Sequence, residues 1–197
     1  MNEKFGFLFF SIFLGLYFLP NKILANSILK KKSNYTIIEK ITGIKFKFVQ
    51  SGFFEIGDQF SEGSIDERKT RKIKIKSFFL AETETTQKQW EKIMKWNRSR
   101  FKRPDYPISN ISWYQVQEFI NNLNLKYQDR YIFRLPTEAE WEYACREKGG
   151  QKRYCNGKNI AKKSEINFDN NGPMAVASFP PNSLGIYDMS GNLREWT

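Results

Sequence analysis

The sequence predicts an α+β fold from short alternating strands, a few capped helices and a long irregular segment. Ile44, Phe46 and Phe48 alternate with lysines, and residues 71–76 alternate in the same way, as strands with one buried face do. Residues 148–181 are rich in Gly, Asn and Pro, which predicts loops with short strands. Short strands, few helices and much irregular chain are typical of the α+β class.

Three helices are predicted by capping boxes, in which a Ser or Thr precedes a Glu or Gln by three residues. The pairs are Thr86 with Gln89, Ser112 with Gln115, and Thr137 with Glu140. Each is followed by apolar residues at helical spacing, which predicts one buried face per helix. These faces comprise Trp90, Ile93 and Met94; Trp113, Val116, Phe119, Ile120 and Leu123; and Trp141, Ala144 and Cys145.

The N-terminus predicts a signal peptide over residues 1–27. An apolar run from Phe5 to Leu19 follows Lys4, and it is shorter than the roughly 20 residues of a spanning helix, so a cleaved leader is favoured over an anchor. Cleavage is expected after Ser27, with cleavage after Ala25 as the alternative. We therefore expect an exported protein of the periplasm, cell envelope or extracellular space, with a linker at 28–36 and one domain at 37–197.

The net charge of +11 and the lack of histidine restrict the possible functions. Basic stretches at 30–32, 71–76 and 92–103 could attract nucleic acid, but an exported protein does not meet that partner. Weak association with an anionic membrane or cell-surface polymer remains as the alternative. Without histidine, Ser-His-Asp and Cys-His nucleophiles and His-based metal sites are excluded.

The stretch Arg134-Leu-Pro-Thr-Glu-Ala-Glu-Trp-Glu-Tyr-Ala-Cys-Arg146 resembles the signature block of the formylglycine-generating, sulfatase-modifying-factor family. Four further stretches are similar to family motifs, in the family's order. They are Phe48–Gly57, Phe78–Trp90 with Glu82-Thr-Glu-Thr-Thr86 inside it, Asp105–Trp113, and Phe179–Thr197. The resemblance therefore extends over roughly residues 44–197 and implies a variant of the C-type lectin-like fold that is rich in irregular structure.

The resemblance also implies an activity, the oxidation of a sulfatase cysteine to formylglycine in a protein or peptide substrate. In the family the copper-binding cysteine pair lies in a segment that follows the equivalent of Glu195-Trp196, whereas this sequence ends at Thr197. We therefore expect a domain that is incomplete at its C-terminus, and a non-catalytic binding or structural module or a truncated fragment. A formylglycine-generating oxidoreductase is the alternative if the missing segment exists, and copper is expected only in that case.

A calcium site is implied by the resemblance of residues 187–195 to a family loop. Carried over, Asp188 and Glu195 would supply side-chain oxygens, and Gly191 and Leu193 backbone carbonyls, to a cation that takes six to eight oxygen ligands. The alternative to a calcium site, judged from residue types alone, is that Asp188 caps a turn and Glu195 lies in solvent. Asn167 resembles the start of a second calcium loop, which is shortened here.

The two cysteines are not predicted to be catalytic. Cys145 lies on the apolar face of its helix, where a small buried hydrophobic residue is expected. Cys155 lies ten residues later, and an exported chain could join the two in a disulfide unless the orientation of Cys145 towards the core prevents it.

Overall fold

The computed structural model describes residues 10–18, 35–60, 70–127, 131–168 and 172–197. Its strands are β1 (Phe10–Ile12), β2 (Gly15–Phe18), β3 (Thr36–Ile38), β4 (Lys45–Val49), β5 (Gly52–Ile56), β6 (Arg71–Ile75), β7 (Phe78–Ala81), β8 (Tyr131–Arg134) and β9 (Arg194–Trp196). Its helices are α2 (Gln87–Met94), α3 (Trp113–Lys126) and α4 (Glu138–Cys145). An α+β fold with much irregular chain is confirmed.

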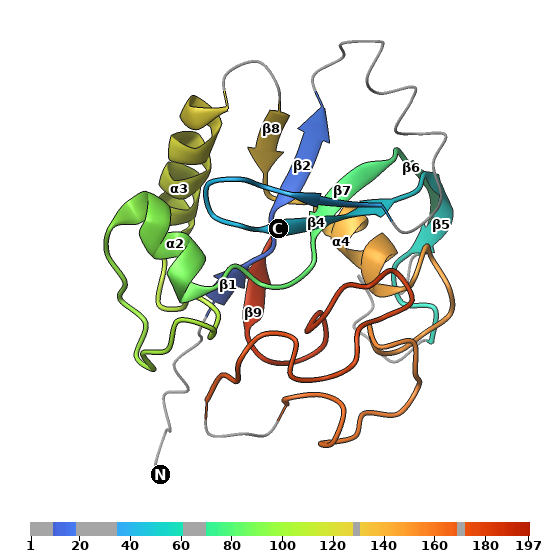
Figure 1. Cartoon of the computed structure of the whole chain (residues 1–197). Helices are drawn as coiled ribbons and strands as arrows, with labels where there is room; N and C mark the ends of the chain where they lie inside the picture. Colours follow the sequence, from blue (N-terminus) through green and yellow to red (C-terminus); the bar gives the residue numbers. More distant parts are fainter. Residues whose placement is uncertain (1–9, 19–34, 61–69, 128–130, 169–171) are drawn as a thin grey trace.

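A five-stranded antiparallel sheet in the order β3-β4-β7-β2-β8 forms the centre of the fold. Figure 1 shows α2 and α3 together on one side of this sheet and α4 near the β5–β6 hairpin. Helix α3 contacts α2 and β8, while α4 contacts β5 and β6. The core between them holds closely packed aromatic rings, including the stacked pair of Trp90 and Phe119 with ring centroids 4.9 Å apart.

The strands predicted around residues 44–48 and 71–76 and the three helix starts are confirmed. Phe46 and Phe48 in β4 point inwards while Lys45 is exposed, and β6 follows the alternation of residues 71–76. All three capping boxes form, with the Ser or Thr oxygen accepting from the backbone N–H three residues on and the Gln or Glu side chain accepting from the cap residue's own N–H. Each cap satisfies backbone groups that the helix itself leaves without a partner.

Two helical faces differ from the predicted ones. Trp113 was expected in the buried face of α3, but it is 44% exposed, because it occupies the first turn, where the helix projects beyond the core. In α4 the fully buried aromatic residue is Tyr143, whereas Trp141 is only partly buried. Tyr143 donates its hydroxyl proton to the carbonyl of Gln50, which satisfies its polar end inside the fold.

Residues 10–18 lie inside the fold, which differs from the expectation of a leader outside it. Strand β2 is placed between β7 and β8, with Gly15 opposite both Leu80 and Arg134. Strand β1 runs parallel to β9, and Ile12, Phe13 and Leu14 are fully buried. The rest of the predicted leader and most of the linker at 28–36 fall outside the described residues, so cleavage remains a prediction. No described helix is long and apolar enough to span a membrane.

The irregular half of the chain carries the candidate site. In the described parts of 148–181 there are turns and bends but no strand, so the short strands expected there do not form. Figure 1 shows these orange and red segments as loops below the sheet, from which the chain returns to form β9.

Candidate functional site

Three carboxylates, those of the buried Glu84 and of the half-buried Asp188 and Glu195, form the centre of the candidate site. Glu84 precedes α2 and has no exposed surface. Glu195 lies in β9 and keeps part of its surface, but its Oε1 atom is buried without a hydrogen-bond partner, as is Oε1 of Glu84. Asp188 lies in the loop before β9, where its Oδ2 accepts the N–H of Ala177 at 2.6 Å.

The backbone of the loop turns sharply because Asp188, Gly191 and Asn192 all adopt left-handed conformations, with φ angles of 58°, 93° and 56°. Asp and Asn tolerate this region better than most residues, and glycine adopts it freely. At Gly191 a side chain is also excluded by space. A Cβ atom there would lie 2.5 Å from the carbonyl oxygen of Asn167 and 2.6 Å from Ile166 Cγ2.

Asn192 joins the loop to Glu84 and to the segment around Asn167. Its Nδ2 donates to Glu84 Oε2 at 2.5 Å, and its Oδ1 accepts from the N–H of Met174 and from Asn167 Nδ2. Its own N–H donates to the carbonyl of Asn167 at 2.8 Å. The amide of Asn192 is therefore used fully in orienting Glu84 and the loop.

The three carboxylates all have raised pKa values. Burial raises the pKa of Asp188 to about 6, although the N–H of Ala177 opposes the shift. Burial, and then the nearby charge of Asp188, raise the pKa of Glu84 well above its ordinary value. For Glu195, burial and the charges of Glu84 and Asp188 act in the same direction. Burial and like charge both disfavour the ionised form.

The structure places Asp188 and Glu195 within electrostatic reach of each other, and Oε1 of Glu195 is buried rather than exposed to solvent. The backbone of Leu193 lies close enough to Glu84 to oppose the rise of its pKa. Asn167 is hydrogen-bonded to Asn192 of this loop, so it lies beside the candidate site rather than apart from it. Part of the predicted second loop, residues 169–171, falls outside the described residues.

The site is rich in oxygen and lacks a compensating cation. Among the described residues, none of the three carboxylates forms an ion pair with a Lys or Arg. In the same part of the chain, no three His, Cys, Asp or Glu side chains are placed so that they alone could hold a metal ion. Calcium would therefore need backbone carbonyl oxygens in its ligand set, as the resemblance implies for Gly191 and Leu193.

Cys145 and Cys155 are joined by a disulfide, with Cα atoms 4.3 Å apart. The bridge ties the end of α4 to the loop that precedes the candidate site. The N–H of Cys155 donates to Ser190 Oγ at 2.8 Å, and its Sγ lies 3.0 Å from the carbonyl oxygen of Met189. The orientation of Cys145 towards the core does not prevent pairing, because Cys155 is buried beside it.

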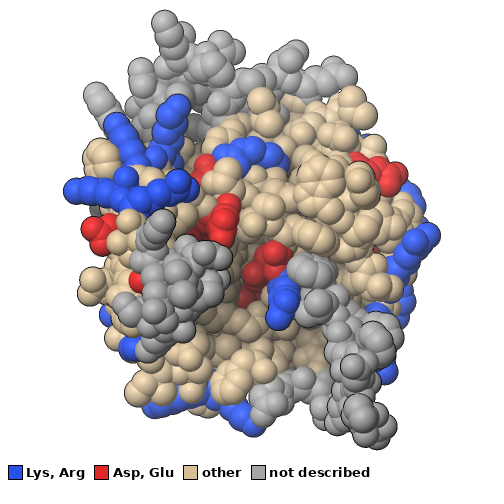
Figure 2. All heavy atoms as spheres, turned by 180° about the vertical axis from the view of Figure 1, so that it is seen from behind, with Lys and Arg blue, Asp and Glu red and all other residues tan. Residues whose placement is uncertain are grey.

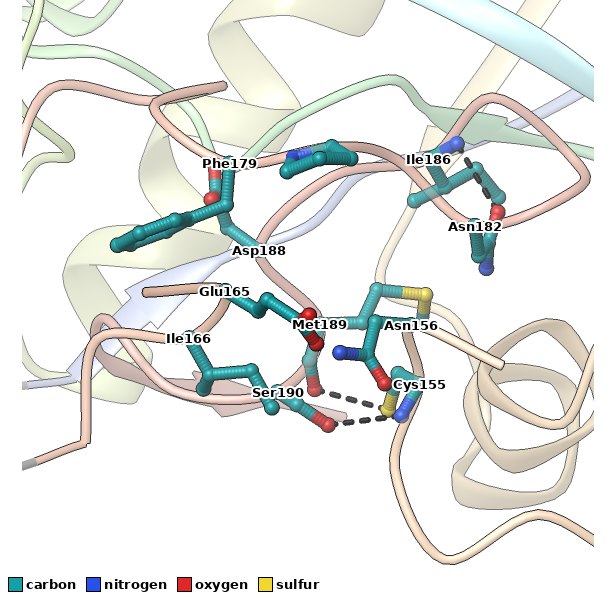
Figure 3. A pocket seen from close by; sticks show the side chains of 11 residues that line it. Cys155, Asn156, Glu165, Ile166, Phe179, Asn182, Ile186, Asp188, Met189 and Ser190 are labelled. Atoms are coloured by element: carbon teal, nitrogen blue, oxygen red, sulfur yellow. Dashed lines mark hydrogen bonds between the residues drawn. The ribbon is translucent and has the colours of Figure 1, made fainter. Parts of the chain in front are cut away.

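A small cavity of about 20 Å³ lies next to this bridge and has room for one water molecule. Figure 3 shows Glu165 and Asn156 on one side of it, while the Asp188 carboxylate is turned away towards Phe179. Glu165 Oε2 and Asn156 Nδ2 are buried without a partner. Because only Asp188 of the predicted calcium residues lines the cavity, the cavity is not the calcium site.

Glu84 and Asn192 are the site residues that the sequence did not single out. Glu84 shares the segment Glu82-Thr-Glu-Thr-Thr86 with a second acid, Glu82, which forms ion pairs with Lys45 and Lys47 instead. Nothing in that spacing distinguishes the buried acid from the paired one. Asn192 adjoins Gly191 in the predicted turn, and its side-chain role follows only from the fold.

Comparison with known proteins identifies the family to which the chain belongs. The family model described as "Sulfatase-modifying factor enzyme 1-like domain" matches residues 39–197. Chaperone protein LppX of Paenibacillus barcinonensis is 30% identical over 179 residues, which cover 64% of this chain and 63% of that protein. Serine/threonine-protein kinase pkn1 of Chlamydia pneumoniae is 31% identical over 170 residues, covering 71% of this chain and 26% of the kinase.

The formylglycine-generating enzyme of Bos taurus is 36% identical over 110 residues, covering 48% of this chain and 27% of the enzyme. The chain thus spans less than two thirds of each of these three relatives.

Two solved structures share the fold. Treponema denticola variable protein 1 matches with a TM-score of 0.67 and 21% identity, over 82% of this chain and 75% of that one. PvdO from Pseudomonas aeruginosa matches with a TM-score of 0.64 and 22% identity, over 81% and 72%. The fold implied by the resemblance is confirmed, and the match over residues 39–197 shows that this chain belongs to the sulfatase-modifying factor enzyme 1-like domain family.

Proposed function

We propose that this chain acts as a calcium-stabilised binding or structural module of its family rather than as a formylglycine-forming oxidase. The observation that carries the proposal is the pair of carboxylate oxygens, Oε1 of Glu84 and Oε1 of Glu195, that are buried without a hydrogen-bond partner close to Asp188. A copper site of the family type needs thiolate ligands, and a disulfide sulfur is not a thiolate. Cys145 and Cys155 are joined in a disulfide, so neither of them offers copper a thiolate.

The names of the relatives support a use of this domain outside formylglycine formation. The alignments to the chaperone and the kinase cover more of this chain than the alignment to the bovine formylglycine-generating enzyme does. Neither of the first two is named for sulfatase modification. As a second part of the proposal, the module acts at the cell envelope or outside the cell, where a disulfide persists.

Copper-dependent activity is tested directly. The full chain, incubated with copper and a peptide containing Cys-x-Pro-x-Arg, should form no aldehyde detectable by hydrazide labelling. An active formylglycine-generating enzyme assayed in parallel shows that the peptide is competent. Aldehyde formation by this chain that disappears in Cys155→Ser would overturn the proposal.

Calcium is the cation that we propose for these three carboxylates. Asp188 and Glu195 would bind it, with the carbonyls of Gly191 and Leu193, and Glu84 would lie close enough to add negative charge. The two unpartnered carboxylate oxygens, Oε1 of Glu84 and Oε1 of Glu195, support this assignment, because a buried charge without a partner is costly. A bound divalent cation would remove that cost and fix the loop.

Thermal unfolding with EDTA or millimolar calcium tests the site. Calcium should raise the Tm of the parent, because it binds the folded form alone. Asp188→Asn and Glu195→Gln should each lose most of that rise. Glu118→Gln is the matched control, because Glu118 is exposed on α3, which packs against α2 and β8. If either site variant responds to calcium as the parent does, the site is not there.

A further inference from the structure

The loop between α2 and α3 presents an unusual number of uncompensated cations. We define the basic loop as residues 95–106. Its exposed cations are Lys95, Arg98, Arg100, Lys102 and Arg103, and its sequence contains a single acid, Asp105. None of the five is in an ion pair with a carboxylate among the described residues. In Figure 2, Lys and Arg side chains line the edge of the molecule on the side of α2.

The basic loop is held in place by buried hydrogen bonds. The side-chain amide of Gln87 donates to the carbonyls of Phe101 and Pro107 at 2.7 and 3.3 Å. Its Oε1 accepts from Asn97 Nδ2 at 2.8 Å and from the N–H of Arg103 at 3.2 Å. A loop fixed in this way keeps its like charges together before any ligand arrives, so binding does not have to order it.

Three arginines of the loop lie over aromatic rings of the same loop. Arg98 is over Trp96, Arg100 over Phe101 and Arg103 over Tyr106, with guanidinium carbons 5.2, 5.6 and 5.6 Å from the ring centroids. These contacts orient the planar guanidinium groups and leave their N–H donors for a ligand. They also cover the ring faces on which nucleic-acid bases would stack.

An exposed aromatic pair lies next to the basic loop. Trp113 and Tyr114, at the start of α3, are 44% and 81% exposed, and their rings meet edge to face with centroids 5.6 Å apart. Asn110 Nδ2 donates to the carbonyl of Arg98 at 3.2 Å, which ties the approach to α3 to the loop. Exposed Trp and Tyr beside Arg form the composition that recurs in binding hot spots.

From these observations we propose that the basic loop and the Trp113–Tyr114 pair bind an acidic polysaccharide, a sugar chain that carries carboxylate, sulfate or phosphate groups. The guanidinium groups match the geometry of such anions. The perpendicular rings offer one face to a sugar but no parallel platform for successive bases. An anionic membrane fits less well, because Trp96, Phe101 and Tyr106 are half-buried, which leaves only the Trp113–Tyr114 pair to insert among lipids.

Binding of heparin, a defined sulfated polysaccharide, tests the proposal. The affinity of the full chain for heparin is measured at several salt concentrations, with folding checked by circular dichroism. The double variant Arg98→Glu with Arg100→Glu should bind about tenfold more weakly or worse, and its affinity should depend less steeply on salt. Trp113→Ala should weaken binding about threefold or more without changing the salt dependence, because it removes no charge.

The matched control is Lys72→Glu with Lys74→Glu, which changes the net charge equally on the β5–β6 hairpin. Figure 1 shows the β5–β6 hairpin on the opposite side of the molecule from α2. The control should retain affinity within about threefold of the parent. Equal losses in both double variants would overturn the proposal in favour of non-specific charge. Tighter binding to single-stranded DNA or to anionic phosphatidylglycerol vesicles than to heparin would overturn it as well.

Discussion

At the scale of single residues, the buried carboxylates couple the charge of the loop to the stability of the fold. Glu84 and Glu195 are held near Asp188 without a cationic partner in the described part of the chain, so ionising them costs free energy in the folded state. Asn192 compensates only Glu84, to which it donates a hydrogen bond. The remaining cost must be met by protonation or by a bound cation.

The first prediction at this scale concerns pH. The pKa of Asp188 is about 6 in the folded protein and about 4 in an unfolded chain, so the folded state binds the proton more tightly. The resulting stability is fully present below about pH 4 and is lost as the pH rises through about 6. In EDTA, lowering the pH from 7.5 to 5 should therefore raise the Tm.

The effect should be on the order of 2 kcal/mol for Asp188 alone, and the raised pKa values of Glu84 and Glu195 act in the same direction. Asp188→Asn should reduce the rise in Tm without otherwise disturbing the loop, since asparagine keeps the left-handed backbone and an oxygen for the Ala177 N–H. A Tm of the parent that falls steadily between pH 7.5 and 5 would contradict this account.

The second prediction at this scale separates backbone strain from lack of space. Gly191→Ala should destabilise the protein by about 3 kcal/mol or more, because its Cβ would collide with backbone at 2.5 Å as well as adopt a positive φ. Gly43→Ala has a similar φ of +82° but nothing within 4 Å of the new Cβ, so it should cost only about 1 kcal/mol. Urea unfolding measures both. Equal losses would show that the close approach to Asn167 is unimportant.

The site residues could be predicted from the sequence only where they lie within a recognisable local motif. Asp188, Gly191 and Glu195 follow from the resemblance of one stretch. Glu84 lies more than 100 positions earlier in the chain, and its burial depends on how β7 leads into α2. Such long-range packing produces no periodic pattern in the sequence.

At the scale of elements, the helices were predictable and the irregular segment was not. The start of each helix is determined by a cap that the sequence displays, so Thr86, Ser112 and Thr137 could be named in advance. The loops between 148 and 192 have no comparable rule. Their path is determined by the disulfide and by side-chain contacts such as Asn182 with the carbonyl of Ala144.

The prediction at this scale concerns the disulfide. A bridge across ten residues should contribute about 2–3 kcal/mol by restricting the unfolded chain, so Cys145→Ala with Cys155→Ala should unfold at lower urea. The same double variant should also bind calcium more weakly, because it removes the bridge that positions the backbone N–H of residue 155 against Ser190 in the candidate loop. Parent protein in reductant is the matched comparison. Unchanged stability together with unchanged calcium response would show that the bridge positions nothing.

At the scale of the whole molecule, the N-terminal residues decide whether the sheet is continuous. Strand β2 separates β7 from β8, and its backbone pairs with both. The apolar run that suggests a leader therefore also supplies a central strand. Apolar runs of this length are common to leaders and to buried strands, so composition alone does not distinguish the two uses.

The last prediction compares the full chain with residues 28–197, the product expected from cleavage after Ser27. Without β1 and β2, the facing edges of β7 and β8 lose their partner, and the environment of Leu80 and Phe133 opens to solvent. The shorter chain should bind a hydrophobic dye and melt without cooperativity, while the full chain should give a sharp transition and near-ultraviolet dichroism. Mass spectrometry of the protein from its native cells identifies the N-terminus in use. A cooperative melt of residues 28–197 would show that β1 and β2 are dispensable, and would leave cleavage of the leader compatible with this fold.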